Sequence, residues 1–119
     1  MTKISAGSVA VFRVDAGPEM GAGHFMRCLA LAEAWQAAGG VAHFIMTKPC
    51  VLSEHLKKRT FGLTTIPNTC PNPNDLQQTL LIIKKQSAVW VIVDGYQFTE
   101  HYLGELSNTG CHILCIDDR

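Results

Sequence analysis

The sequence lacks an excess of charge of either sign. Lysine and arginine together number 10, aspartate and glutamate together number 10, and the formal net charge at pH 7 is zero. Proteins that bind nucleic acid or anionic membranes through their surface field need a net positive region, which this balance does not supply. We therefore expect neither nucleic acid nor a membrane among its partners.

Long apolar segments are also missing. No apolar run approaches the ~18 residues that a membrane-spanning helix requires. The N-terminus does not show the basic-then-apolar pattern of a secretion signal. We therefore expect a cytoplasmic location.

Cysteine and histidine do not form metal-binding patterns. The five cysteines are Cys28, Cys50, Cys70, Cys111 and Cys115. None forms a Cys-x-x-Cys pair, and no two histidines show the i, i+4 spacing with an acidic partner that marks a metal motif. The sequence predicts neither a disulfide framework nor a metal site, and buried thiols in a reducing compartment are expected instead.

Apolar residues are abundant enough for one core. Hydrophobic residues make up 47% of the 119 residues and charged residues 17%, which excludes a disordered chain. We expect residues 1–119 to form a single domain.

Segments typical of strands alternate with segments typical of helices. Strands are predicted at 9–15, 41–46, 62–66, 88–94 and 111–116, and helices at 24–38, 51–59, 74–86 and 99–107. Asn74 and Asp75 are typical residues for capping the third of these helices. This alternation predicts an α/β fold: a Rossmann-like, doubly wound parallel sheet with strand order 3-2-1-4-5 and helices on both faces.

Polar residues gather where such a sheet binds ligands. Ligands bind beyond the carboxyl ends of the strands, at the point where strand order reverses. That point is predicted between the first and fourth strands, which lead into Asp15 and into Asp94 to Tyr96. Asp117 and Asp118 follow the fifth strand on the same rim.

The loop at 16–23 is the strongest local signal. Gly17, Gly21 and Gly23 let the backbone approach a ligand, and the next helix offers its first N–H groups. A dinucleotide fingerprint needs a small residue where Met26 stands and an acidic residue at the end of the second strand, where there is none. No P-loop is present either, and no cofactor is expected.

His24 is predicted in the first turn of the helix that follows this loop. The helix dipole disfavours the imidazolium there, so a neutral imidazole at the ligand rim can act as a general base. The alternative is a histidine that only packs on the helix start. Asp94 could likewise hold a ligand or pair with Arg13 or Arg27.

Two strings of this sequence resemble one family. The string from Arg13 to Ala16 and the string from Gly21 to Ala32 (Gly-Ala-Gly-His-Phe-Met-Arg-Cys-Leu-Ala-Leu-Ala) are similar to the opening of the PseG family. These proteins are the UDP-sugar hydrolases of pseudaminic acid biosynthesis, related to SpsG-type polysaccharide biosynthesis proteins. The resemblance continues through Val91 to Tyr96 and Cys115 to Asp118, so it spans nearly the whole chain.

The resemblance implies the N-terminal half of a glycosyltransferase-B-like fold. It further implies metal-free hydrolysis of a UDP-linked diacetamido-trideoxy-altropyranose into UDP and the free sugar, with His24 as the catalytic base. The implied substrate-binding residues are Arg13, Asp15, Gly21, Gly23, Arg27, Asp94 and Tyr96.

The resemblance also implies a partner. Relatives hold the uridine and diphosphate mainly with a C-terminal domain, so a further domain or second chain is expected to complete the cleft, and the isolated chain is expected to have little activity. Two alternatives stay open: half of a sugar transferase, and a binding or interaction domain without catalysis.

Overall fold

A computed structural model of the chain describes residues 6–14, 23–47, 61–66, 73–94 and 98–116. The elements in chain order are β1 (Val9–Val14), α1 (Gly23–Ala37), β2 (Val41–Thr47), β3 (Gly62–Ile66), α3 (Pro73–Gln86), β4 (Trp90–Asp94), α4 (Glu100–Ser107) and β5 (His112–Ile116). The helix predicted over 51–59 lies outside the described residues.

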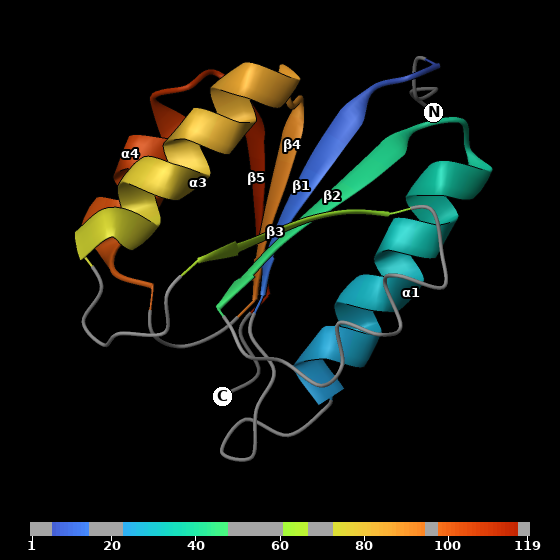
Figure 1. Cartoon of the computed structure of the whole chain (residues 1–119), viewed down its shortest axis with the longest axis horizontal. Coiled ribbons are helices and arrows are strands. Elements are labelled where there is room, and N and C mark those ends of the chain that lie inside the picture. Colours follow the sequence, from blue (N-terminus) through green and yellow to red (C-terminus); the bar gives the residue numbers. More distant parts are fainter. Residues whose placement is uncertain (1–5, 15–22, 48–60, 67–72, 95–97, 117–119) are drawn as a thin grey trace.

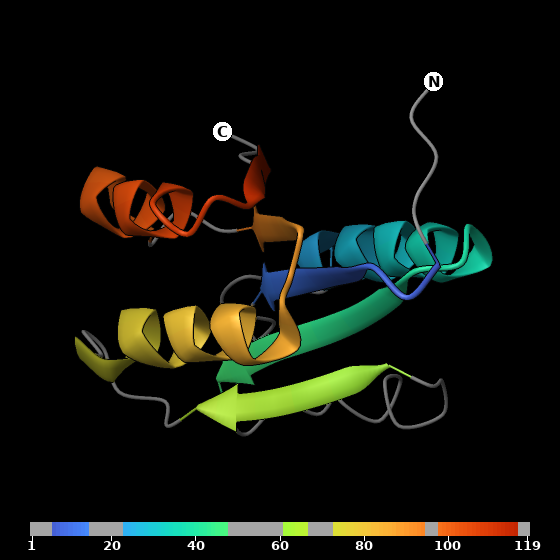
Figure 2. The same cartoon turned by 90° about the horizontal axis from the view of Figure 1, so that it is seen from above.

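The five strands form one parallel sheet in the order β3-β2-β1-β4-β5. Helix α1 covers one face of the sheet, and α3 and α4 cover the other (Figures 1 and 2). The predicted α/β, Rossmann-like fold and its strand order are confirmed.

The side chains of β1 point alternately to the two faces of the sheet, and the core forms one cluster on each face. On the α1 face, Phe12 stacks on Phe44 at 5.0 Å between ring centroids, and Phe25 of α1 packs on Phe44 at 6.0 Å. On the other face, Val11 packs with buried residues of α3 and α4, among them Leu106. Because side chains alternate along a strand, the central strand serves both clusters.

Half of the predicted element ends coincide with the observed ones, and the others differ by one or two residues. The fourth strand begins at Trp90 instead of residue 88, because the Ala88 N–H bonds the Ile83 carbonyl and closes the end of α3. Helix α3 begins at Pro73, so Asn74 and Asp75 lie inside its first turn. The prediction that they cap this helix is wrong, because proline suits the first helical position.

Two glycines follow the C-terminal end of helix α1. Gly39 adopts φ of +101°, which favours glycine. At Gly40 a Cβ atom would overlap the Trp35 indole, whose Nε1 donates to the Ser8 carbonyl at 2.9 Å. These contacts fix the C-terminal end of α1 against the start of β1.

Candidate functional site

The carboxyl ends of β1 and β4 lie side by side. Val14 is in register with Asp94, and each is the last residue of its strand. The strand order reverses between these two strands, and this is where doubly wound sheets bind ligands. The described structure therefore has a topological switch point between the strands that the sequence predicted.

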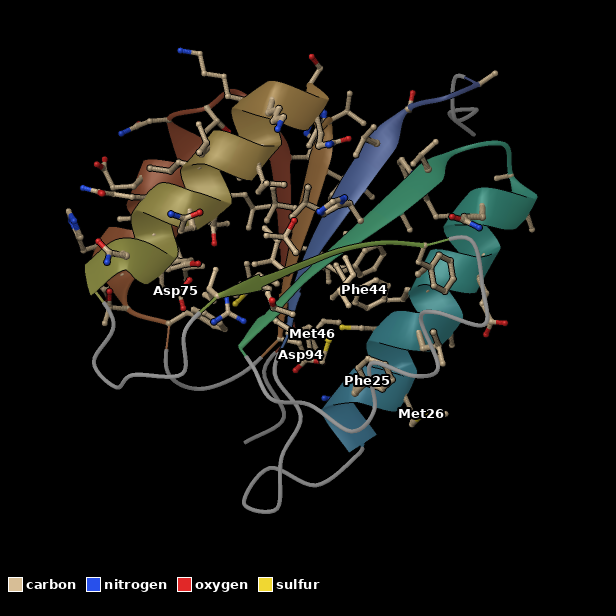
Figure 3. All side chains as sticks on the ribbon, in the orientation of Figure 1. Phe25, Met26, Phe44, Met46, Asp75 and Asp94 are labelled. Carbon is tan, nitrogen blue, oxygen red and sulfur yellow. The ribbon has the colours of Figure 1, made fainter. Side chains whose placement is uncertain are left out.

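Asp94 is fully buried and faces α1. Its Oδ1 lies 3.6 Å from an Nη atom of Arg27, and its Oδ2 accepts a hydrogen bond from the Cys28 thiol at 3.6 Å. We call these three residues the Asp94 cluster. Figure 3 shows Asp94 at the strand ends beside the first turns of α1. The cluster therefore joins β4 to α1 across the switch point.

The two partners of Asp94 differ in exposure. The Arg27 side chain is 41% exposed, whereas Cys28 is buried. Burial raises the pKa of the Cys28 thiol, and the adjacent Asp94 carboxylate raises it further. The thiol therefore stays protonated and serves as a hydrogen-bond donor instead of a nucleophile.

Gly23 and His24 are the first two residues of α1. Their backbone is helical, and the side chain of His24 lies outside the described part of the structure. Helix geometry sets position 24 one turn before Cys28, on the same side of the helix. The backbone of the predicted base is thus at the rim, one turn from the Asp94 cluster.

Several predicted site residues lie outside the described residues. They are Asp15, Gly21 and Tyr96, together with Gly17, Asp117 and Asp118 of the predicted rim.

Arg13 lies on the opposite face of the sheet from α1. Its Nε and Nη atoms donate to the two carboxylate oxygens of Asp75 in α3, at 3.0 and 2.5 Å, and its guanidinium sits 5.1 Å from the centre of the Phe98 ring. Another Nη contacts the Ile45 carbonyl at 3.4 Å. Arg13 is therefore part of the packing between β1 and α3.

Asp75 is the centre of a polar cluster on that face. It accepts hydrogen bonds from Tyr102 at 2.7 Å and Thr79 at 3.3 Å in addition to those from Arg13. We call Arg13, Asp75, Thr79 and Tyr102 the Arg13 cluster. Burial by itself disfavours the charged carboxylate, but these donors and the arginine charge outweigh it and lower the pKa of Asp75.

The sequence alone does not reveal this cluster. Asp75 was expected to cap a helix, and Thr79 and Tyr102 belong to no motif. The available signal was Arg13 itself, a charged residue in the middle of an apolar strand. Such a residue needs a buried acidic partner, which only the packing of α3 identifies.

An apolar hollow runs along the sheet beside α1. It has a volume of about 190 Å³ and is lined by Phe12, Leu31, Trp35, Trp90, Ile92 and Leu114. Leu31 and Leu114 are 40% and 41% exposed. The lining offers no side chain for proton transfer, so the hollow provides packing surface but no catalytic group.

In the described ranges, no group of three or more His, Cys, Asp or Glu side chains could hold a metal ion. No helix within them is long and apolar enough to cross a membrane.

Comparison of the chain with protein-family models, curated proteins and solved structures finds no match. The assignment of fold therefore rests on the observed strand order and helix placement. Any assignment of function rests on the residues at the carboxyl edge of β1 and β4.

Proposed function

We propose that this domain forms the catalytic-base half of a UDP-sugar hydrolase. The reaction releases UDP and a free diacetamido-trideoxy sugar for pseudaminic acid or a related surface polysaccharide. One observation carries the proposal: helix α1 begins with Gly23 and His24 next to the switch point between β1 and β4. This is where the fold class binds ligands, and the residues there are those that resemble the hydrolase family.

His24 acts as the general base in this proposal. Its neutral imidazole takes a proton from water as the water oxygen attacks the anomeric carbon. The bond between that carbon and the diphosphate oxygen breaks, and UDP leaves with the electron pair. Attack from the opposite face inverts the anomeric centre. The N-terminal end of a helix keeps the imidazole neutral because the dipole opposes a positive charge there.

The other candidate residues bind or organise the substrate. Gly21 and Gly23 bring the backbone close to the sugar or diphosphate, and Tyr96 borders the sugar. Asp15 and Arg27 order the loop around the base. A further domain or second chain grips the uridine and the diphosphate and so completes the cleft.

The test is replacement of His24 in the protein with its completed cleft. His24→Asn should lower UDP release from the UDP-sugar by about 10²–10⁴-fold, the contribution typical of a general base. The matched control is His101→Asn, because His101 is exposed on α4 and should leave turnover unchanged. Full activity of His24→Asn with an unchanged circular dichroism spectrum would show that the proposed base is wrong.

The same assay separates hydrolysis from sugar transfer. A hydrolase releases free sugar with water as the sole acceptor, whereas a transferase needs an added acceptor. UDP release that depends on an added acceptor would favour the transferase half.

A binding role without catalysis is the second candidate. The partly exposed Leu31 and Leu114 beside the apolar hollow favour it, because apolar surface of this kind is often covered by a partner. Light scattering distinguishes a lone monomer from a self-associating chain. Activity of the completed cleft that depends on His24 would exclude a purely binding role.

A further inference from the structure

We propose that Asp94 is a positioning residue, which holds the first turns of α1 against β4 through Arg27 and Cys28 and thereby sets the place of His24 at the rim. The catalytic part of this inference rests on the proposed function. The positioning part rests on the described contacts alone.

The contacts join two elements that no short segment of chain connects. Asp94 ends β4, and Cys28 lies 66 residues earlier in α1. The carboxylate meets Arg27 with one oxygen and Cys28 with the other, each at 3.6 Å. One fully buried side chain therefore contacts two successive helix positions from a neighbouring strand.

Helix geometry directs these contacts to the side of α1 that carries position 24. Residues three and four apart lie on one side of a helix, so positions 24, 27 and 28 share that side. The same side continues through Leu31 and Trp35, which line the apolar hollow with β4 residues Trp90 and Ile92. This side of α1 therefore faces β4, and Asp94 contacts its N-terminal part.

The two ends of α1 are attached to the sheet by different contacts. The first turn opens with a glycine, which weakens a helix relative to other residues. At the other end, Trp35 bonds the Ser8 carbonyl and the Ala42 N–H bonds the Gln36 side chain at 3.4 Å. The Asp94 cluster supplies the corresponding attachment at the end that carries the base.

A buried carboxylate is an unfavourable way to make a contact that serves only packing. A buried carboxylate carries a large desolvation cost, and an apolar residue at the same place would pack without it. What the carboxylate adds is two polar contacts from one side chain, an ion pair to Arg27 through one oxygen and a hydrogen bond from Cys28 through the other. Position matters for a base, since small displacements of a catalytic group strongly reduce the rate.

Amide hydrogen exchange on this chain tests the positioning directly. In Asp94→Asn, we expect the amides of Arg27, Cys28 and Leu29 to exchange about tenfold faster, because the variant keeps an acceptor oxygen but loses the charge that strengthens the contacts with Arg27 and Cys28. Amides of Leu80 to Ile83 in α3 should keep their wild-type rates. Equal acceleration in both helices, or none in α1, would overturn the proposal.

A matched pair at Cys28 keeps the test valid if Asp94→Asn does not fold. Cys28→Ser retains a donor to Asp94, whereas Cys28→Ala removes it with nearly the same side-chain size. We expect faster exchange in the first turns of α1 for the alanine variant and near-wild-type exchange for the serine variant. Identical rates in the two variants would contradict a role of this hydrogen bond.

Turnover of the completed cleft tests the catalytic part. Cys28→Ala should lower kcat by about tenfold with KM nearly unchanged, and Cys28→Ser should restore most of kcat. A loss that falls equally on KM, or no rescue by serine, would contradict positioning of the base. Absence of turnover by the wild-type domain with its cleft completed would overturn the proposed function, and the exchange rates distinguish that outcome from failure of the Asp94 cluster.

Discussion

The Arg13 cluster and the Asp94 cluster each attach a helix to the sheet, on opposite faces of it. Each uses an arginine and an aspartate to attach the end of a central strand to the first turns of a helix. Arg13 is 1% exposed and makes two hydrogen bonds to one carboxylate, whereas Arg27 is 41% exposed and its Nη lies 3.6 Å from an oxygen of Asp94. The Arg13–Asp75 contact is therefore buried, whereas the Arg27–Asp94 contact is partly exposed at the rim.

This difference separates stability from function. A buried guanidinium with a fully bonded partner cannot move without leaving a charge unpaired, so the Arg13 cluster fixes β1, α3 and α4 relative to one another. A half-exposed arginine keeps access to water, so its ion pair contributes less to stability. The same pair of residue types therefore stabilises the fold on one face and attaches α1 beside the rim on the other.

Asp75→Ala should have the largest effect on stability. It leaves the buried Arg13 charge without its carboxylate and removes the acceptor of Tyr102. We expect a loss of about 3–5 kcal/mol in the free energy of unfolding, the usual cost of breaking a buried ion pair. Urea unfolding followed by circular dichroism measures it.

The control is the double variant Arg13→Met with Asp75→Leu. Apolar residues of similar size replace both charges, so most of the lost stability should return. A double variant as unstable as Asp75→Ala would show that the packing of these side chains, and not the unpaired charge, accounts for the loss.

Acid should weaken the same cluster by a smaller amount. The pKa of Asp75 is lowered in the folded protein from its ordinary value of 3.8. Its contribution is therefore complete above that value and is lost as pH falls through the lower folded-state pKa. The free energy of unfolding should fall as pH drops below about 3.8 toward the lower folded-state pKa, and fall less steeply in Asp75→Ala. Parallel curves for the two proteins would contradict this assignment.

Arg27→Ala should have the smallest effect on stability. Its guanidinium is substantially exposed, so we expect a loss of no more than about 1 kcal/mol in urea unfolding. Asp94 keeps its hydrogen bond from Cys28 in this variant. A loss as large as that of Asp75→Ala would remove the distinction between the two clusters.

Most of the fold could be predicted because its signals are local. The apolar strand at 88–94 and the glycines after α1 marked element type and ends within a few residues. The strand order was predicted as the commonest arrangement of a doubly wound sheet, and the structure confirms it. Boundaries were less predictable, because the end of α3 depends on the bond between Ala88 and Ile83.

The sequence predicted where the candidate site lies, but only part of the set of residues that form it. Position 24 and Asp94 were expected at one rim, because parallel strands bring their carboxyl ends to one edge. Arg13 was expected there too, and the described structure pairs it with Asp75 on the other face. Alternation along β1 sets which face Arg13 occupies, but it does not identify the helix that will cover that face.

The sequence by itself determined the fold class, the order of the strands and the edge at which a site can form. These properties depend on periodicity and short connections, which neighbouring residues encode. Only the tertiary structure decided the partners of the buried aspartates: Arg13 with Asp75, 62 residues apart, and Cys28 with Asp94, 66 residues apart. Such pairs depend on how helices pack against the sheet. Each aspartate therefore meets its partner only when helices cover the two faces of the sheet.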